Sequence, residues 1–201
     1  MLQVRVKILY NKKIKGNYFH LVLQASKITK ESLPGQFLNI KVNGAYEPLL
    51  RRPFSIHRLK GANVELLYEV VGEATEVLSQ RKPGEYLDVI GPLGNGFTLN
   101  TKHKTLNILV AGGMGVAPLI FLAEKLAEGK MQNVKRKTLV LLGAKTKNQL
   151  ICEKEFKALG CEIKISTDDG SKGFKGKVTD LLRNLVSSIE YRVSTIYACG
   201  P

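Results

Sequence analysis

The sequence has few cysteines, no long apolar run and no leader-like N-terminus, and each absence excludes a class of protein. Its 201 residues include three cysteines, Cys152, Cys161 and Cys199, an odd number without the close spacing of metal ligands. They therefore predict neither a disulfide framework nor a metal site. No apolar run approaches the ~20 residues that a membrane-spanning helix needs. The alternating N-terminus also lacks the apolar block of a signal peptide, so we expect a cytoplasmic protein with no membrane partner.

Acidic residues are also scarce. There are 31 Lys and Arg against 17 Asp and Glu, a net charge of +14. This balance favours acidic partners, namely phosphorylated cofactors, an acidic protein or nucleic acid. The basic residues are spread along the chain rather than gathered with aromatic residues, which favours a solvated basic surface. A nucleic-acid-binding barrel stays open as an alternative.

The N-terminal half has the period-2 alternation of half-buried strands. Turn signals such as Leu33-Pro34-Gly35 and Asn43-Gly44 separate the alternating segments. Six strands are predicted, over residues 4–8, 19–23, 36–42, 53–59, 63–71 and 87–90. Many short strands joined by turns favour a closed antiparallel β-barrel, here over residues 1–100. The glycine-rich stretch 91–97 is expected to be a loop.

The C-terminal half, residues 101–201, alternates strands with helices. Strands are predicted over residues 106–110, 138–142, 162–167 and 195–199, and helices over 119–126, 153–159 and 178–186. This order predicts a parallel α/β sheet with right-handed crossovers. The expected fold class is therefore an antiparallel barrel followed by a parallel α/β domain.

Arg52-Pro53-Phe54-Ser55 combines a cation, a rigid residue, an aromatic ring and a hydroxyl at the start of a predicted strand. Arginine suits phosphate oxygens, Pro53 fixes the backbone, and Phe54 and Ser55 offer a ring and a hydrogen-bonding group. The stretch can hold a phosphate at one end and a planar ring at the other. The alternative is an edge strand with solvated arginines.

A second anion site is predicted at Gly72-Glu73-Ala74-Thr75, where a helix begins. Thr75 is the expected N-cap, and the free N–H groups of the first turn attract anions. A diphosphate bound by Arg52, Gly72 and Thr75 would use both sites. An ordinary capped helix is the alternative.

The strongest local motif is Gly113-x-Gly115-x-x-Pro118, which follows Gly112 directly after a predicted strand. Glycines there let a diphosphate approach the backbone at a helix N-terminus. Pro118 replaces the usual third glycine and suits a first helical turn. The acidic residue expected about 20 positions further on is missing, so the motif departs from the standard dinucleotide fold.

Together these motifs resemble the ferredoxin-NADP reductase superfamily, and within it the electron-transfer subunits of NAD-dependent dihydroorotate dehydrogenases. The resemblance covers the whole chain and rests on six motifs in order. They are Arg52-Pro53-Phe54-Ser55, Leu67-Tyr68-Glu69, Gly72-x-Ala74-Thr75, Gly91-Pro92-Leu93-Gly94-x-Gly96-Phe97, Gly113-x-Gly115-x-x-Pro118, and a nicotinamide-side motif in two parts, Thr167-Asp168-Asp169-Gly170-Ser171 and Cys199-Gly200-Pro201.

The resemblance implies an FAD-binding barrel, an NAD-binding α/β domain and a partner, the catalytic flavoprotein dehydrogenase subunit. It assigns FAD to Arg52, Pro53, Phe54, Ser55, Ile56, Leu67, Tyr68, Glu69, Gly72, Ala74 and Thr75, and the nicotinamide nucleotide to Gly112, Gly113, Gly115, Pro118 and Asp168. Ser55 and Cys199 are expected beside the reacting rings. Hydride passes directly between the two rings, so the protein mainly positions them. The implied activity is electron transfer between FAD and NAD(H) for dihydroorotate oxidation to orotate in pyrimidine biosynthesis.

Three departures accompany the resemblance. Ala74 replaces a glycine, and Glu69 stands where relatives carry Arg or Lys. Relatives also continue into a helix and a cysteine-rich segment with a [2Fe–2S] cluster, which needs four cysteines. The chain is therefore expected to be a truncated piece or to work without the cluster. NAD rather than NADP rests on the resemblance, because Lys145, Lys172 and Lys175 also suit a phosphate. A stand-alone NAD(P)H-flavin or ferredoxin reductase, or a subunit of another redox complex, stays open.

Overall fold

The computed structural model describes residues 1–44, 47–99, 106–128, 137–187 and 193–201. The chain forms two compact units, Met1–Gly96 and Phe97–Pro201. The boundary predicted between residues 100 and 101 falls outside the described residues. No helix within the described ranges is both long and apolar enough to cross a membrane.

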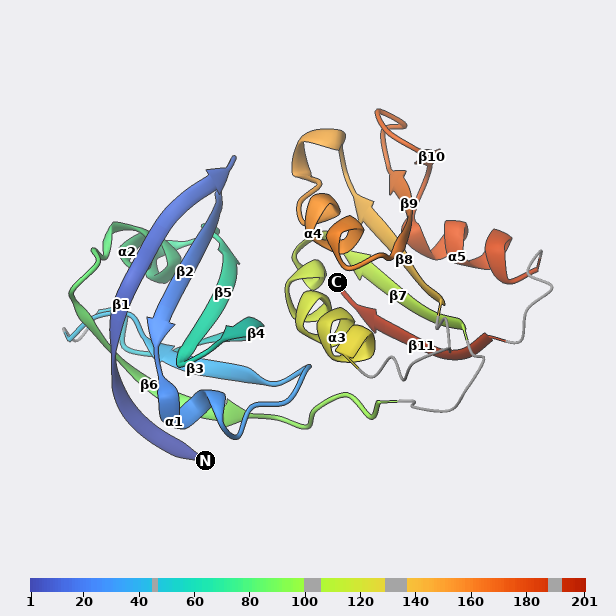
Figure 1. Ribbon diagram of the computed structural model, residues 1–201. Helices are drawn as coiled ribbons and strands as arrows, with labels where there is room; N and C mark the ends of the chain where they lie inside the picture. The colour runs from blue at the N-terminus through green and yellow to red at the C-terminus, as the bar shows by residue number, and fades with distance from the viewer. Residues whose placement is uncertain (45–46, 100–105, 129–136, 188–192) are drawn as a thin grey trace. The chain divides into compact units, whose positions relative to one another are not determined.

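The first unit is a closed antiparallel barrel, which confirms the predicted fold (Figure 1). Around the barrel the strands follow the order β1-β2-β5-β4-β3-β6. Their bounds are β1 Leu2–Lys15, β2 Tyr18–Gln24, β3 Phe37–Lys41, β4 Arg52–Lys60, β5 Asn63–Glu69 and β6 Tyr86–Leu93. Two helices accompany the strands, α1 (Ser26–Thr29) and α2 (Glu73–Gln80).

Alternation along the strands builds the barrel core. Leu21 and Leu23 on β2, and Leu38 and Ile40 on β3, are completely buried, while their neighbours in sequence face outward. Complete burial of such a side chain stabilises the fold by about 1.5–3 kcal/mol. Closure gives each of these six strands two hydrogen-bonded neighbours, which shortens the edges open to another chain.

Strand ends differ from the sequence-based expectation in two places. β1 continues to Lys15, well past the predicted end at residue 8, because its first half pairs with β6 and its second half with β2. Hydrogen-bonded pairing thus sustains a stretch whose side chains are largely polar. The expected loop at residues 91–97 begins as the last part of β6, where a Cβ on Gly91 would lie 2.4 Å from Cδ2 of Leu38. Only glycine permits this close approach.

The second unit is a parallel sheet in the order β10-β9-β8-β7-β11, which confirms the predicted α/β architecture. The strands are β7 Leu106–Gly112, β8 Lys137–Ala144, β9 Glu162–Thr167, β10 Phe174–Lys175 and β11 Val193–Cys199. The helices are α3 Val116–Glu128, α4 Glu153–Ala158 and α5 Val178–Val186, with 3-10 turns η1 (Gly113–Gly115) and η2 (Lys147–Gln149). Neither α1 nor the two-residue β10 was predicted, because both are too short for a periodic pattern.

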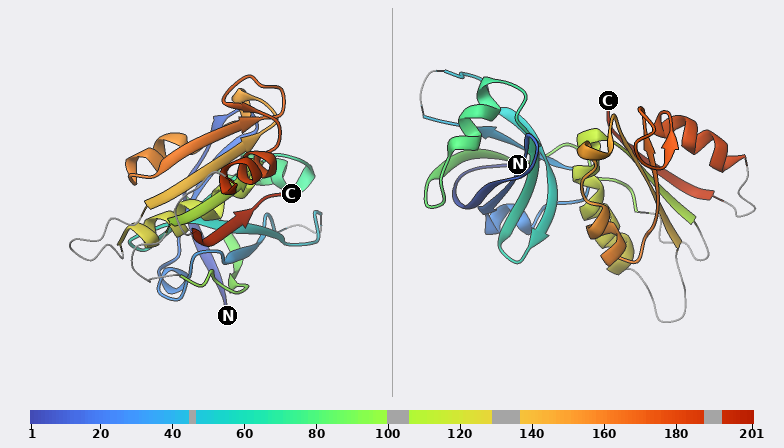
Figure 2. Two further views of the ribbon diagram at one scale, coloured as in Figure 1. Left: turned by 90° about the vertical axis from the view of Figure 1, so that its right-hand side faces the viewer. Right: turned by 90° about the horizontal axis from the view of Figure 1, so that it is seen from above.

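Helices cover both faces of this sheet, as Figures 1 and 2 show: α3 and α4 lie on one face and α5 on the other. Leu181 of α5 packs in a core cluster with Ile108, Val110, Leu139 and Leu141. The β7 and β8 residues between them, such as Leu109 and Val140, are also buried. A strand covered on both faces is apolar throughout, which explains the nearly continuous apolar run in β7.

Candidate functional site

The strand order of the second unit identifies a ligand-binding edge. From β7 the chain moves through β8 to β9 and β10 on one side, and β11 then pairs with β7 on the other side. The carboxyl ends of β7 and β11 therefore flank a topological switch point, where open α/β sheets bind their ligands. The predicted nucleotide turn and the Cys199-Gly200-Pro201 segment both lie at these ends.

Two glycines of this turn have different structural roles. A Cβ on Gly115 would lie 2.0 Å from the carbonyl oxygen of Cys199, so only glycine lets the turn pack against the end of β11. Gly113 adopts a left-handed conformation with φ of +51°, and nothing lies within 4 Å of the Cβ position. Gly113 therefore leaves open space in which a phosphate could approach the backbone, whereas Gly115 is a packing residue. Pro118 is buried in the first turn of α3, a position that tolerates its missing N–H.

Cys199 is the last residue of β11 and pairs with Ala111 of β7. The side chain is partly buried, and burial raises the pKa of the thiol above its ordinary value. The thiol is therefore neutral near pH 7 and is a weak nucleophile. A position at the switch point fits a role in contacting a ligand rather than in covalent chemistry.

The turn that follows β9 contains two adjacent aspartates, Asp168 and Asp169, whose carboxylates have different surroundings. Asp169 accepts hydrogen bonds from the Ser171 amide at 2.9 Å and the Ser171 hydroxyl at 2.6 Å. These bonds hold the pKa of the Asp169 carboxyl below its ordinary value and fix the turn. The Asp168 amide donates to the carbonyl of Ala144, while its exposed carboxylate has no hydrogen bond or ion pair among the described residues. Asp168 is therefore the aspartate available to a ligand.

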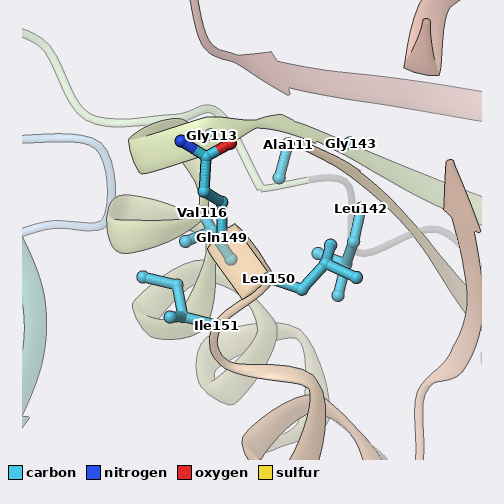
Figure 3. A pocket seen from close by; sticks show the side chains of 8 residues that line it. All are labelled: Ala111, Gly113, Val116, Leu142, Gly143, Gln149, Leu150 and Ile151. Atoms are coloured by element: carbon cyan, nitrogen blue, oxygen red, sulfur yellow. The ribbon is translucent and has the colours of Figure 1, made fainter. Parts of the chain in front are cut away.

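A small pocket beside the turn contains a residue that sequence reasoning missed. The pocket has room for about one water molecule, ≈ 10 Å³, and lies at the ends of β7 and β8 (Figure 3). Gln149 extends from η2 with its amide toward Gly113. The available signal was position, since residues 147–149 follow β8 at the carboxyl edge, but no residue pattern distinguishes them from an ordinary loop.

On the barrel, β4 and β5 bring two of the predicted flavin motifs together. Ile56 pairs with Leu66, and the Phe54 ring lies 5.7 Å from the Tyr68 ring in an edge-to-face arrangement. The start of β4 and the end of β5 therefore lie at one end of the barrel, where the chain continues into α2. The Ile56 side chain is completely buried and Leu67 nearly so, so these residues can offer a ligand mainly their backbone.

Tyr68 is fixed by a buried polar network. Its hydroxyl donates to Oδ1 of Asn11 at 2.9 Å, and Nδ2 of Asn11 donates to the carbonyls of Leu78 and Arg81 at the end of α2. Burial raises the pKa of Tyr68 far above its ordinary value, so the phenol stays protonated. The network connects β5, β1 and α2 and holds this end of the barrel in one arrangement. Glu69, the next residue, pairs with Tyr18 of β2 and remains partly exposed.

Arg52 and Ser55 have unused hydrogen-bonding capacity. The Arg52 guanidinium donates to the carbonyls of Leu50 and Arg51, and within the described ranges no carboxylate pairs with it. The Ser55 side chain is partly exposed, and its hydroxyl has no hydrogen-bond partner among those residues. Pro53 is exposed on β4, opposite Asn39. A free guanidinium, a free hydroxyl and an adjacent aromatic ring fit a phosphate and a flavin ring.

The predicted N-cap of α2 was wrong: the cap is Gly72, and Thr75 lies inside the first turn. Thr75 Oγ1 accepts from the amides of Val71 and Gly72 and donates to the Gly72 carbonyl at 2.8 Å. Thr75 therefore closes the turn from within. Gly72 has no side chain to cap the helix, so the first amides of α2, which include that of Ala74, can donate hydrogen bonds to an anion. Gly72 is in extended conformation with φ of 177°, and its Cβ position is open.

The residues present do not fit an iron–sulfur cluster. Such a cluster needs four thiolates, and the chain has three cysteines, which lie before α4, after α4 and at the end of β11. In the part of the chain that the structure describes, no group of three His, Cys, Asp or Glu side chains could hold a metal ion.

Comparisons with known proteins match both units. Residues 109–201 match the family model of the oxidoreductase NAD-binding domain. Over 199 residues the chain is 40% identical to the dihydroorotate dehydrogenase B (NAD(+)) electron transfer subunit of Desulforamulus reducens, covering 97% of this chain and 72% of the relative. The subunit of the same name from a Geobacillus species is 39% identical over 206 residues and is covered to 76%.

Solved structures of reductases share the fold of this chain. The structure of an NADH-dependent reduced ferredoxin-NADP oxidoreductase matches 98% of the chain with a TM-score of 0.81 and 32% identity, and 67% of that chain is covered. Ferredoxin-NADP+ reductase from Plasmodium falciparum shares the fold at a TM-score of 0.77 and 15% identity, with 98% of this chain and 85% of that chain covered.

Fold and site together define an oxidoreductase of the ferredoxin-NADP reductase type, with a flavin-type barrel and a nucleotide-binding sheet. The relatives that match nearly the whole of this chain define its family more narrowly. The chain belongs to the family of dihydroorotate dehydrogenase B (NAD(+)) electron transfer subunits, which confirms the resemblance seen in the sequence motifs.

Proposed function

We propose that this chain is a flavoprotein electron-transfer subunit that passes electrons between FAD and NAD(H) during the oxidation of dihydroorotate to orotate. The proposal rests on one observation above all: 40% identity, over 97% of the chain, to a subunit of that name. A catalytic dehydrogenase subunit that oxidises dihydroorotate is the implied partner. A cytoplasmic location remains part of the same proposal.

The barrel residues would hold the flavin. Arg52 and the first amides of α2 offer the donors that a diphosphate needs, since no described carboxylate pairs with Arg52 and the N-cap residue Gly72 has no side chain. Ser55 and the backbone around Ile56 would contact the ring system, and the network of Tyr68 and Asn11 would keep that strand in place. FAD, when bound, supplies a ring that exchanges hydride with a nicotinamide.

The α/β unit would hold the nicotinamide nucleotide. Gly113 leaves the backbone open to its diphosphate, and Cys199 lies at the switch point where the reacting ring is expected. The free carboxylate of Asp168 suits ribose hydroxyls and repels a 2′-phosphate. Lys172, a cation suited to such a phosphate, is already ion-paired, because its Nζ lies 2.5 Å from Oε2 of Glu153. These features support NAD over NADP.

The test is to purify the chain with FAD, record its visible spectrum, and add NADH without oxygen. A flavin band that NADH bleaches, together with dihydroorotate-dependent NAD+ reduction when a dihydroorotate-oxidising subunit is added, would support the proposal. A colourless protein that FAD does not colour would contradict it.

A second candidate is a subunit of a different redox complex. It is favoured by the 32% identity to a structure described as an NADH-dependent reduced ferredoxin-NADP oxidoreductase. In that case NADH would bleach the flavin, but dihydroorotate would give no NAD+ reduction with the added subunit, while reduced ferredoxin would.

A further inference from the structure

A pocket of ≈ 500 Å³ lies on the outer face of β1, β3 and β6, and no step of the proposed electron transfer uses it. Asp88 of β6 pairs with Arg5 of β1 on one side and with Lys41 of β3 on the other. Leu87 and Val89, its neighbours along β6, are buried in the barrel core, so Asp88 projects outward. Cross-strand partners share one face of a sheet, and the three side chains therefore form a row across the pocket.

The carboxylate of Asp88 takes its hydrogen bonds from groups other than the two cations that flank it. Arg51 donates to Oδ2 at 2.9 Å and Gln3 donates to the same oxygen at 3.0 Å. The hydrogen bond from Arg51 contributes most to holding the pKa of Asp88 below its ordinary value, and the nearby charge of Lys41 adds to the effect. The Arg5 guanidinium lies 4.9 Å from the centroid of the Tyr86 ring, and no described carboxylate forms an ion pair with Arg5 or Lys41. Both charges remain available to a ligand.

One further group at the pocket has an unused polar atom. Arg81 is engaged, because its Nη2 donates to the Tyr86 carbonyl and its Nε is ion-paired with Oε2 of Glu85 at 3.2 Å. Oδ1 of Asn43, in contrast, is buried without a hydrogen-bond partner among the described residues. Buried polar atoms are nearly always hydrogen-bonded in folded proteins, and an amide oxygen accepts, so this atom indicates an absent donor from a ligand hydroxyl or ordered water.

Charge and size indicate the class of ligand. Among the described residues that line the pocket, Asp88 is paired with Arg51 and Arg81 with Glu85, which leaves the positive charges of Arg5 and Lys41 without an ion pair. Small-molecule sites usually have volumes of about 300–1,000 Å³, and arginine forks match phosphate oxygens. We infer that this pocket binds a phosphorylated small molecule through its dianionic phosphate group, with Arg5 and Lys41 as the ligating cations.

The inference is independent of the flavin assignment. All nine lining residues are described, and none of them belongs to the predicted FAD motifs. Arg52, the expected diphosphate ligand, follows Arg51 directly, but its guanidinium donates to the Leu50 and Arg51 carbonyls rather than to Asp88. A phosphate in the pocket would therefore add an anion site separate from the predicted site of the flavin diphosphate.

The test is isothermal titration of the FAD-loaded protein with inorganic phosphate and with pyrophosphate at constant ionic strength. The variant is Arg5→Gln with Lys41→Gln, and the matched control is Lys13→Gln with Lys60→Gln, which removes two exposed barrel charges outside the pocket. We expect saturable one-to-one binding by wild type and control, and at least about tenfold weaker binding by the pocket variant.

Amide NMR shifts of the wild-type protein during the phosphate titration make the test independent of variant folding. Shifts centred on Arg5, Lys41 and Asp88 support the site, and shifts centred elsewhere overturn it. If phosphate binding weakens equally in the control variant, the phosphate responds to diffuse charge and the proposed site is wrong. If the pocket variant loses FAD, the pocket is part of the flavin site and not a separate one. If phosphate does not bind but single-stranded RNA binds tightly, the pocket belongs to a nucleic-acid-binding surface.

Discussion

Arg51 is bound to Asp88 through two hydrogen bonds, from Nη1 to the backbone carbonyl at 2.8 Å and from Nη2 to Oδ2 at 2.9 Å. The next residue, Arg52, donates only to the carbonyls of Leu50 and Arg51. Two adjacent arginines thus have different roles: one is bound within the barrel, and the other keeps a charge available for an anion.

Arg52→Gln should lower the affinity for FAD by about tenfold or more, because the variant loses a charge-assisted contact to the diphosphate. Fluorescence titration of the apoprotein with FAD measures this. Arg51→Gln is the matched control: it should retain FAD and lose about 1 kcal/mol of stability, since the ion pair is partly exposed. Equal FAD affinity in wild type and Arg52→Gln would remove Arg52 from the flavin site.

Gly115→Ala should destabilise the protein by about 3 kcal/mol, because the new methyl group would overlap the backbone of Cys199. Gly112→Ala, in the same turn, is the control: its Cβ would be 3.6 Å from the nearest atom, an ordinary contact, and it should cost well under about 1 kcal/mol. Urea unfolding monitored by circular dichroism measures both. Similar losses in the two variants would contradict the packing role of Gly115.

Tyr68→Phe should cost about 1–2 kcal/mol, because Oδ1 of Asn11 would lose its buried donor. The raised pKa of Tyr68 also predicts a pH dependence. The folded state favours the protonated phenol, so this stability is fully present below the unfolded pKa of about 10 and falls as pH rises above it.

The measurement for Tyr68 is the urea midpoint between pH 8 and about pH 11. Tyr10→Phe is the control, since its ring packs against His20 and its hydroxyl has no hydrogen bond with described residues. If the stability of Tyr68→Phe falls with pH as steeply as that of the wild type, a group other than Tyr68 causes the decline.

Asp168→Asn should raise kcat/KM for NADPH relative to NADH by about tenfold, because a charge that repels the 2′-phosphate is removed. Asp169→Asn is the comparison. It should weaken the use of both coenzymes equally, since Asp169 fixes the turn through Ser171. Steady-state rates with an artificial electron acceptor give both ratios, and an unchanged ratio in Asp168→Asn would assign the discrimination elsewhere.

Much of this molecule follows from local pattern. Alternation predicted all six barrel strands, and the apolar run through β7 predicted the strand that precedes the nucleotide turn. The boundaries were less predictable: β1 extends to Lys15 through pairing with two partners, and Thr75 closes its turn from within rather than capping it. Such features depend on which strand or amide lies opposite, and periodicity carries no information on that.

The sequence by itself determined the two architectures, the order of the cofactor motifs and the family, because these depend on residue types at fixed spacings along one chain. Tertiary structure alone decided that Gly115 packs against Cys199 while Gly113 stays open, that Asp88 engages Arg51 and not Arg52, and that Arg5, Lys41 and Arg81 surround one pocket. The physical reason is that strand register and barrel closure bring together residues far apart in the chain, and only the folded backbone fixes their distances.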